Sequence, residues 1–326
     1  MTDQLPAPPT PARDIDVLVL GEINPDVIVR SADPRPQFGQ VERIVESVDL
    51  TLGSSSVIFA CGAATLGLRV AFVGLVGDDA MGRFMLEEMR ARGIDTVGCR
   101  TVESVPTGAT VILTDGRDRA ILTAPGTAPL LRDEDVPAAL LARARHVHVG
   151  SAFLLDALRP NLAERFAATR RDGATTSLDC NWDPRETWDG GLRGILRETD
   201  VFLPNAAEAI RIAGLDTVED AALALAATGP RVVAVKCGDA GALAAEPNGR
   251  LTRVPAIATD VVDTTGAGDS FDAGFLVAWL AGRPVGECLA LGVACGSLST
   301  RRVGGTSGQP TLAEAEAAAR EAGLLA

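Results

Sequence analysis

The sequence predicts an α/β fold in which a mostly parallel sheet is covered by helices on both faces, a three-layer α/β/α sandwich. First, short β-branched runs alternate with helical patterns along most of the chain, as is typical of parallel sheets. Second, 326 residues with 47% hydrophobic content are enough for one large domain. Third, period-two patterning at 39–52 and 95–123 predicts a small antiparallel sheet, a lid with segments at about 28–52 and 95–123.

The predicted elements follow one another in a regular order. Residues 1–13 contain four prolines and are expected to form a disordered tail, which leaves 14–326 as a single α/β domain. The predicted strands are 15–21, 70–77, 146–150, 175–179, 200–204 and 232–236. The predicted helices are 54–66, 79–92, 133–144, 156–171 and 205–213, followed by a helical C-terminal third at about 267–281, 285–299 and 311–323.

The composition excludes several classes of function. The formal net charge of −13 disfavours nucleic acid and anionic membranes as partners, because such a chain repels phosphate groups. Lys236 is the only lysine and does not follow spaced glycines, so a Walker-type P-loop cannot be built. The six cysteines form no C-x-x-C pair, and no apolar stretch approaches the ~18 residues of a membrane helix. We therefore expect a cytoplasmic protein without disulfides or a zinc site.

The most informative segment is D-T-T-G-A-G-D-S-F at 263–271, which leads into a helical pattern. Small residues at a helix start let several backbone N–H groups point at one spot, where the helix dipole favours an anion. Asp269 would repel a resting phosphate there, but it is well placed to accept a proton from a hydroxyl that attacks phosphorus. Kinase chemistry uses both features, whereas the simpler alternative is a turn in which Asp269 only stabilises the helix N-terminus.

This segment resembles the C-terminal signature of the ribokinase-like (pfkB-type) family of ATP-dependent sugar and nucleoside kinases, and the resemblance extends in order from about residue 15 to 311. It implies a ribokinase-like fold with ATP and Mg²⁺ as cosubstrate and cofactor. It also implies that Asp269 is the catalytic base, with the backbone N–H groups of Gly266, Ala267 and Gly268 forming the anion hole. The same turn, with Thr265, would contact the nucleotide.

Two further segments resemble the substrate-binding elements of the family. Asn24 and Asp26 lie two residues apart after the first strand, as in the family's N-x-D pair for sugar hydroxyls, although an ordinary turn would also explain them. Gly53 matches a family glycine, whereas Ser54 replaces a second glycine and Ile58 replaces an asparagine that contacts the sugar. Serines 54–56 are also suited to cap a helix. Asn181 is a further candidate for substrate binding.

The remaining candidates concern the nucleotide and metal ions. Asn205 and Glu208 match the family's N-x-x-E element, which implies that Glu208 holds Mg²⁺ through water, yet the pair is also a capping-box pattern. Lys236, Gly238 and Gly241 resemble the nucleotide-binding strand and turn of the family. A loop around Gly304 matches a family site for a monovalent cation, K⁺, although Gly-Gly would also make a plain turn. The residues assigned to that candidate site are Asp263, Thr265, Gly304 and Ser307.

The sequence therefore predicts an ATP-dependent kinase that phosphorylates a hydroxymethyl group of a sugar or sugar-like alcohol. A nucleoside kinase of the same family is the nearest alternative. A nicotinamide-dependent dehydrogenase is remote, because no G-x-G-x-x-G follows the first strand, and a non-catalytic sugar sensor is equally remote. The expected partner is a small-molecule sugar, and a homodimer through the lid sheet is a candidate assembly.

Overall fold

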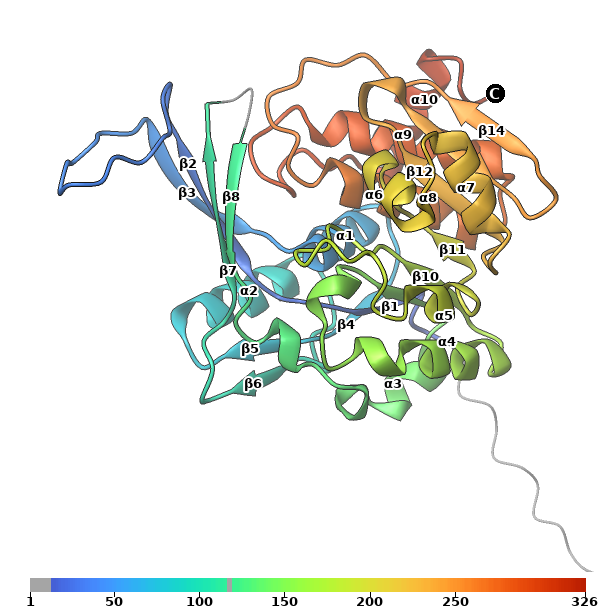
Figure 1. Cartoon of the computed structure of the whole chain (residues 1–326), viewed down its shortest axis with the longest axis horizontal. Coiled ribbons are helices and arrows are strands. Elements are labelled where there is room, and N and C mark those ends of the chain that lie inside the picture. The colour runs from blue at the N-terminus through green and yellow to red at the C-terminus, as the bar shows by residue number, and fades with distance from the viewer. Residues whose placement is uncertain (1–12, 116–118) are drawn as a thin grey trace, which may run out of the picture.

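The computed structural model describes residues 13–115 and 119–326, so the predicted tail lies outside the described residues except for Arg13. Two parts are visible in Figure 1, an α/β body and a small sheet that projects from it. No helix in the described part of the chain is long and apolar enough to cross a membrane.

The body is built on an eight-stranded sheet with the order β14-β13-β12-β11-β10-β9-β1-β4. The strands from β4 to β12 are parallel, and β13 and β14 add an antiparallel hairpin at one edge. Most are short runs of buried apolar residues, as expected for strands covered on both faces. Their bounds are β1 Val17–Leu20, β4 Val70–Val73, β9 His146–Val149, β10 Thr175–Leu178, β11 Val201–Phe202, β12 Val232–Lys236, β13 Ala242–Ala245 and β14 Leu251–Val254.

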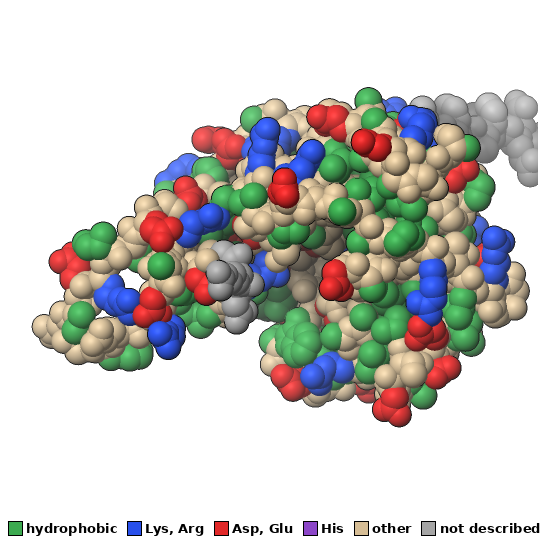
Figure 2. All heavy atoms as spheres, turned by 90° about the horizontal axis from the view of Figure 1, so that it is seen from above, with side chains coloured by type: hydrophobic (Ala, Val, Ile, Leu, Met, Phe, Trp, Pro, Cys, Tyr) green, Lys and Arg blue, Asp and Glu red, His purple; other side chains and the backbone are tan. Residues whose placement is uncertain are grey.

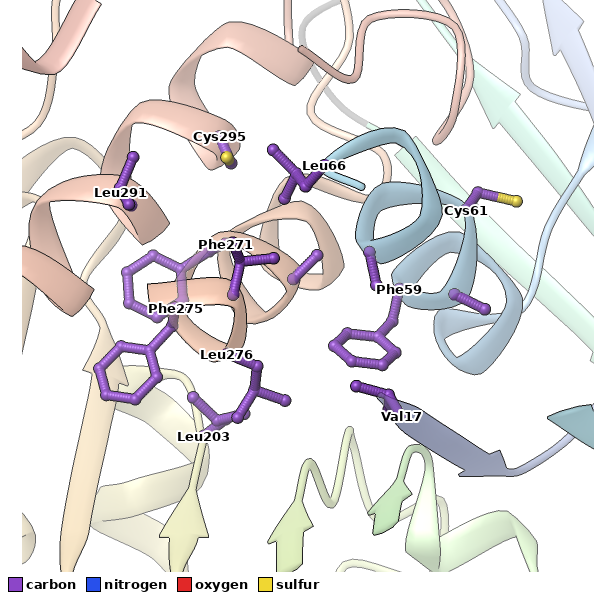
Figure 3. Close-up of a cluster of buried hydrophobic side chains, with 14 of the residues drawn as sticks. Val17, Phe59, Cys61, Leu66, Leu203, Phe271, Phe275, Leu276, Leu291 and Cys295 are labelled. Carbon is purple, nitrogen blue, oxygen red and sulfur yellow. The ribbon is translucent and has the colours of Figure 1, made fainter. Parts of the chain in front are cut away.

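Helices cover both faces of this sheet, which confirms the three-layer α/β/α sandwich. Alternate residues of β1 point to opposite faces, so Val17 and Val19 belong to one core cluster and Leu18 and Leu20 to the other. The first cluster, shown in Figure 3 around Phe59 and Phe275, includes α1 Ser55–Thr65, α2 Ala80–Ala91, α8 Ala267–Leu280, α9 Val285–Ser299 and α10 Leu312–Glu321. The second includes α3 Ala138–Arg143, α4 Leu162–Arg171, α5 Leu192–Leu196, α6 Ala206–Ala213 and α7 Val218–Ala226.

The projecting lid is a four-stranded sheet with the order β3-β2-β7-β8. Its strands are β2 Pro25–Arg30, β3 Ser47–Leu52, β7 Ala109–Thr114 and β8 Arg119–Ala124. The expectation of an antiparallel sheet was wrong for its centre, because β2 and β7 pair in parallel. These two strands come from different excursions of the chain, and no hairpin forces them to run in opposite directions.

Three predicted elements are interrupted. The strand expected at 70–77 breaks at Gly74, after which β5 Leu75–Gly77 pairs with β6 Arg100–Val102, so 100–102 is not part of the lid. The helices expected at 133–144 and 156–171 each begin with a 3₁₀ turn, Asp133–Asp135 and Arg159–Asn161, before α3 and α4. Pro137 and Pro160 lie at these breaks, because proline lacks the N–H that a continuous helix needs.

Candidate active site

The carboxyl ends of the parallel strands open onto two neighbouring cavities. The larger, of 770 Å³, lies between these strand ends and the lid, and the smaller, of 560 Å³, lies between β12, α8 and α9. Lys236, Gly238, Thr264 and Gly268 line both cavities, which therefore join at the start of α8. Figure 2 shows the molecule hollowed between the lid and the body. After the substrates that the sequence predicts, we call the larger space the sugar cavity and the smaller the nucleotide cavity.

The turn before α8 is held in a conformation that requires glycine. Gly266 is the N-cap of α8 with φ +71°, and a Cβ there would lie 2.8 Å from the Cα of Gly305. Asp263 links the turn around Gly266 to the loop that carries Gly304 and Gly305. Its carboxylate accepts hydrogen bonds from the backbone N–H of Thr265 (2.9 Å) and of Gly304 (2.8 Å). The turn around Gly266 at this helix N-terminus is thereby shaped for an anion, and we call it the anion turn.

Asp269 lies in the first turn of α8 and lines the sugar cavity. Burial and, to a smaller extent, the charge of Asp179 raise the pKa of this carboxyl to about 8, although the charge of nearby Lys236 acts in the opposite direction. A carboxylate at the N-terminus of a helix, beside backbone N–H groups, can accept a proton from a hydroxyl at the cavity wall.

The sequence-predicted sugar-binding residues converge on this cavity. Asn24 and Asp26 line it, and Asn24 Nδ2 donates to Thr110 Oγ1 of the lid at 3.2 Å. Burial raises the pKa of Asp26 to about 7, even though the positive charge of Arg119 acts in the opposite direction. Gly53 lies against Asp26, because a Cβ on Gly53 would be only 2.1 Å from Asp26 Oδ1. The glycine thus leaves room for the carboxylate.

Ser54 and Ile58 are both buried, and their roles differ. Ser54 caps α1 by accepting from the N–H of Val57 (3.2 Å), and its hydroxyl donates to the carbonyl of Glu22 (2.6 Å). Ile58 lines the cavity and packs under the anion turn, where its Cδ1 would lie 2.4 Å from a Cβ added to Gly305. A branched apolar side chain therefore fills the space between the cavity and this turn.

Asn205 and Glu208 form the capping box that their spacing predicts, and both line the sugar cavity. Glu208 accepts from the backbone N–H of Asn205 (2.9 Å) and from its Nδ2 (2.6 Å). Burial raises the pKa of Glu208 to about 7, and the charge of Asp179 acts in the same direction. A capping box and a residue that holds Mg²⁺ through water are therefore structurally compatible interpretations of this motif.

Glu208 also belongs to a cluster whose composition tests the expectation of Mg²⁺. Ligand atoms of Asp179, Cys180 and Glu208 lie within 4.8 Å of one another. Burial raises the pKa of the Cys180 thiol, so it stays protonated, and Asp179 is ion-paired with Lys236. The Glu208 carboxylate supplies the oxygen ligands that Mg²⁺ prefers. The residues present therefore fit a water-mediated magnesium site at Glu208.

Lys236, whose side chain is 12% exposed, lies between two carboxylates. Its Nζ lies 2.8 Å from Asp179 Oδ2 and 3.1 Å from both carboxylate oxygens of Asp272. The pKa of Asp272 is raised by burial, and that of Lys236 is raised by its carboxylate partners despite burial. Because the ammonium is engaged within the protein, Lys236 contributes positive charge beneath Gly268 rather than a free donor.

The nucleotide cavity is lined mainly by small and apolar residues. Gly238 and Gly241 lie on its wall, and Gly241 has φ +85° with Val254 O only 2.1 Å from where a Cβ would be. Sequence spacing did not point to the other wall, which consists of the 256–261 loop and residues of α8 and α9: Ala256, Ile257, Ala258, Thr259, Val261, Phe271, Val293, Gly296, Ser297 and Thr300. Such a slot suits a flat, largely apolar ring.

Several residues of the sugar cavity had no signal in the sequence. Arg119 of β8 reaches across from the lid, where its guanidinium donates to Thr265 Oγ1 at 3.0 Å. Trp182 presents a half-exposed ring at the wall, with the guanidinium of Arg211 5.1 Å from the ring centre. The one sequence feature that indicates this wall is the tryptophan directly after Asn181. Arg185, four residues after Asn181, pairs with Asp156 at 2.7 Å and is not among the residues that line the cavity.

The candidate monovalent-cation residues lie on two adjoining loops. Asp263 Oδ1 also accepts from Thr265 Oγ1 at 2.7 Å, and its other oxygen holds Gly304. Ser307 is exposed on the same loop as Gly304. The hydrogen bonds of the Asp263 carboxylate thus hold the two loops together behind the anion turn.

Comparisons with known proteins agree with this geometry. A family model described as pfkB family carbohydrate kinase matches residues 14–312. The ATP-dependent ribose-1-phosphate kinase of Halopiger xanaduensis is 32% identical over 296 residues, 90% of this chain and 94% of the relative. The fructokinase of Klebsiella pneumoniae is 32% identical over 277 residues, 79% and 88% of the two chains.

Solved structures share the fold. The structure of Arabidopsis thaliana ribokinase complexed with ribose and ATP matches with a TM-score of 0.80 at 24% identity, covering 94% of this chain and 99% of that chain. The large, mostly parallel sheet and the projecting lid described above are therefore parts of a ribokinase-like fold. The chain belongs to the pfkB family of carbohydrate kinases.

Proposed function

We propose how this chain, an ATP-dependent sugar kinase, transfers the γ-phosphoryl group of ATP to a hydroxymethyl group, with Asp269 as the general base. One observation carries the proposal: Asp269 lines the sugar cavity, and the neighbouring Gly268 lines both cavities. A phosphoryl group at the turn would face the sugar on one side and the rest of the nucleotide on the other. The carboxylate and the anion hole would then act on the same reacting atoms.

The chemistry follows from this placement. The Asp269 carboxylate accepts the proton of the attacking hydroxyl, while the N–H groups of Gly266 and Gly268 stabilise charge on the transferred group. The N–H of Ala267, the third predicted donor, instead donates to the Thr264 carbonyl at 3.3 Å. The dipole of α8 adds partial positive charge at the same point. Because the chain is strongly acidic, these fixed donors matter more here than side-chain cations. The lid would exclude water from the sugar cavity and so protect the phosphoryl group from hydrolysis.

The substrate end of the proposal assigns Asn24 and Asp26 to sugar hydroxyls, with Gly53, Ser54 and Ile58 shaping the pocket. Amide and carboxylate groups side by side can hold neighbouring hydroxyls in bidentate fashion. Trp182 offers an aromatic surface at the same wall, against which the apolar face of a sugar can pack.

The direct test is a coupled ADP-release screen with the purified enzyme over pentoses, hexoses, keto-deoxy sugar acids, ribose 1-phosphate and nucleosides. Ribose 1-phosphate is included because of the relative from Halopiger xanaduensis. We expect ADP release with at least one sugar, abolished by Asp269→Asn. Turnover of nucleosides alone would favour the nucleoside kinase, and no ADP release with any sugar would contradict the proposal.

For the metal, we assign Glu208 as the residue that holds Mg²⁺ through water, with Asn205 orienting its carboxylate. Bound between the phosphates, Mg²⁺ would neutralise charge on the transferred group. Glu208→Gln should raise the Mg²⁺ concentration for half-maximal rate by about tenfold or more, the scale for residues that position a metal. If only the capping box matters, thermal stability falls and the Mg²⁺ dependence stays unchanged.

For a monovalent cation, we assign K⁺ to the loops that carry Asp263, Thr265, Gly304 and Ser307. The support is that Asp263 ties both loops together behind the anion turn. A cation there would stabilise the turn's geometry. The assay compares kcat in K⁺ with kcat in tetramethylammonium at equal ionic strength, and equal rates would remove K⁺ from the mechanism.

For the assembly, we propose a homodimer through the outer face of the lid. Cross-strand register places Leu50, Val27, Val111 and Leu122 in one row on the face opposite Ile112 and Ile121, which line the cavity. Leu122 and Val48 are each 62% exposed on this apolar face. Light scattering should give a dimer, and Leu122→Lys should shift it to monomer. A monomeric wild type at micromolar concentration would contradict this assembly.

A further inference from the structure

Three charged side chains, Lys236, Asp179 and Asp272, form a cluster at the junction of the two cavities. Lys236 is the last residue of β12, Asp179 directly follows β10, and Asp272 lies in α8. Lys236 Nζ is 2.8 Å from Asp179 Oδ2 and 3.1 Å from each carboxylate oxygen of Asp272. Three segments that are far apart in the sequence therefore meet at one ammonium group.

The Lys236 ammonium lies beneath the anion turn. Its Nζ would be 3.7 Å from a Cβ added to Gly268, whose backbone N–H is assigned to the anion hole. Lys236, Gly238, Thr264 and Gly268 line both cavities, and Lys236 is the charged member of this set. A phosphate chain that extends from a nucleotide in one cavity to a sugar in the other must pass these residues. Its negative charge would therefore lie beside the Lys236 ammonium.

Asp272 holds this ammonium from the protein interior. Its side chain is 1% exposed and lines neither cavity, and both of its oxygens contact Lys236 Nζ. Asp272 lies three residues after Asp269, so both side chains project from the same face of α8. Replacing a buried ion pair by apolar residues of similar volume is often neutral or stabilising. Stability alone is therefore a poor explanation for a buried ion pair at this junction.

We propose that Lys236 stabilises the phosphate chain of ATP electrostatically where the chain crosses between the cavities, and that Asp272 is the positioning residue that holds the ammonium there. The N–H groups of Lys236 stay on the two carboxylates, so the ammonium acts through its charge. This charge also offsets that of Asp179, which lines the sugar cavity and would otherwise repel the phosphates. The inference rests on the transfer from ATP proposed above.

The first test measures binding and uses the fact that Lys236 is the only lysine of the chain. Enzyme made with isotope-labelled lysine has a single side-chain ammonium signal in NMR spectra. We expect the ATP analogue AMP-PNP to shift this signal, and AMP, which lacks the phosphate chain, to shift it much less. Calorimetry establishes that each nucleotide is saturating.

Two outcomes of this titration would overturn the proposal. One is a signal that does not move in enzyme saturated with AMP-PNP, and the other is an equal shift with AMP and AMP-PNP. If calorimetry detects no binding of AMP-PNP at all, the proposed function is contradicted instead, so the two failures are distinguishable.

The second test separates the charge of Lys236 from its packing. Lys236→Met leaves Asp272 buried without its partner, so the melting temperature should fall, and kcat/KM for ATP should fall about 10- to 100-fold. Lys236→Met combined with Asp272→Leu replaces the ion pair by apolar side chains, so the melting temperature should recover while kcat/KM for ATP stays low. Recovery of both quantities would show that the ion pair is merely structural.

Asp272→Asn tests the positioning role, because an amide offers the ammonium one oxygen instead of two. We expect kcat/KM for ATP to fall several-fold, with the KM for the sugar changed less than twofold and a displaced lysine signal. Unaltered kcat/KM for ATP would remove this role from Asp272. The matched control is Arg165→Met with Asp133→Leu, which removes an ion pair of 2.6 Å outside both cavities. A loss of kcat/KM there as large as in Lys236→Met would overturn the proposal.

Discussion

The sugar cavity and the nucleotide cavity meet at Gly268 but are built on different principles. The sugar cavity gathers carboxylates from separate parts of the chain, including Glu22, Asp26, Asp179 and Asp269, and closes with a wall of lid residues. The nucleotide cavity is a mainly apolar slot between β12, α8 and α9, with glycines where the backbone must come close. We therefore expect binding and chemistry in the sugar cavity to depend on individual polar groups, and binding in the nucleotide cavity to depend on its shape.

The largest expected effect lies in the sugar cavity. Asp269→Asn should lower kcat by about 10²–10⁴, the scale for removing a general base, because an amide cannot accept the proton. Binding of ATP, measured by calorimetry, should change little, because the nucleotide cavity is intact. A variant that retained more than about a tenth of the wild-type kcat would remove Asp269 from this role.

The pH dependence of the wild type should report the same group. Only the ionised carboxylate accepts a proton, and the pKa of Asp269 is raised to about 8, so kcat/KM for the sugar should rise by up to about a hundredfold between pH 6 and pH 9. The charged form is also disfavoured in the folded state, so the stability that the protonated carboxyl contributes below its ordinary pKa of 3.8 is lost progressively as pH rises to about 8. Asp269→Asn should therefore have a higher melting temperature than wild type at pH 9 and no such advantage at pH 4.

Asp26→Ala tests recognition rather than proton transfer. Losing a hydrogen bond to a charged acceptor should cost about 1.5–3 kcal/mol, which is roughly a 10- to 150-fold loss of kcat/KM for the sugar. The KM for ATP should stay within twofold of wild type, because Asp26 does not line the nucleotide cavity. Comparable losses for both substrates would show that the two cavities are not separable.

Gly241→Ala is the corresponding change in the nucleotide cavity. With φ +85° and a carbonyl 2.1 Å from the added Cβ, the turn must shift, at a cost of about 1–3 kcal/mol in stability. We expect the KM for ATP to rise several-fold while the KM for the sugar is unchanged. Thermal unfolding checks the first effect and steady-state kinetics the second, and an unaltered KM for ATP would contradict the placement of the nucleotide.

The smallest effect concerns specificity at Ile58. An apolar side chain beside Asn24 and Asp26 cannot pair with a hydroxyl, so D-ribose should be a poor substrate and Ile58→Asn should improve its kcat/KM a few-fold. The variant should also lose some stability, since Ile58 packs against the anion turn. If D-ribose is the best of a broad panel for the wild type, the pocket is completed by other residues.

Local patterns accounted for the elements that depend on neighbours in sequence. The Asn205–Glu208 capping box, the Gly266 turn before α8 and the alternation of strands with helices all lie where spacing predicts them. The interrupted helices also follow from a local property, because Pro137 and Pro160 disfavour a continuous helix at these positions.

Contacts between segments that are distant in the chain could not be predicted from the sequence. Its residue types determined that this chain forms a parallel sheet with an anion turn and an acidic residue beside it, since helix capping, strand periodicity and glycine conformations are local properties. Only the tertiary structure decided that Lys236 lies between Asp179 and Asp272, that Arg119 reaches Thr265, and that β2 and β7 run in parallel. The spacing of two residues along the sequence does not give the distance between them in the folded protein. The partner of a buried charge therefore depends on which strand ends the fold brings together.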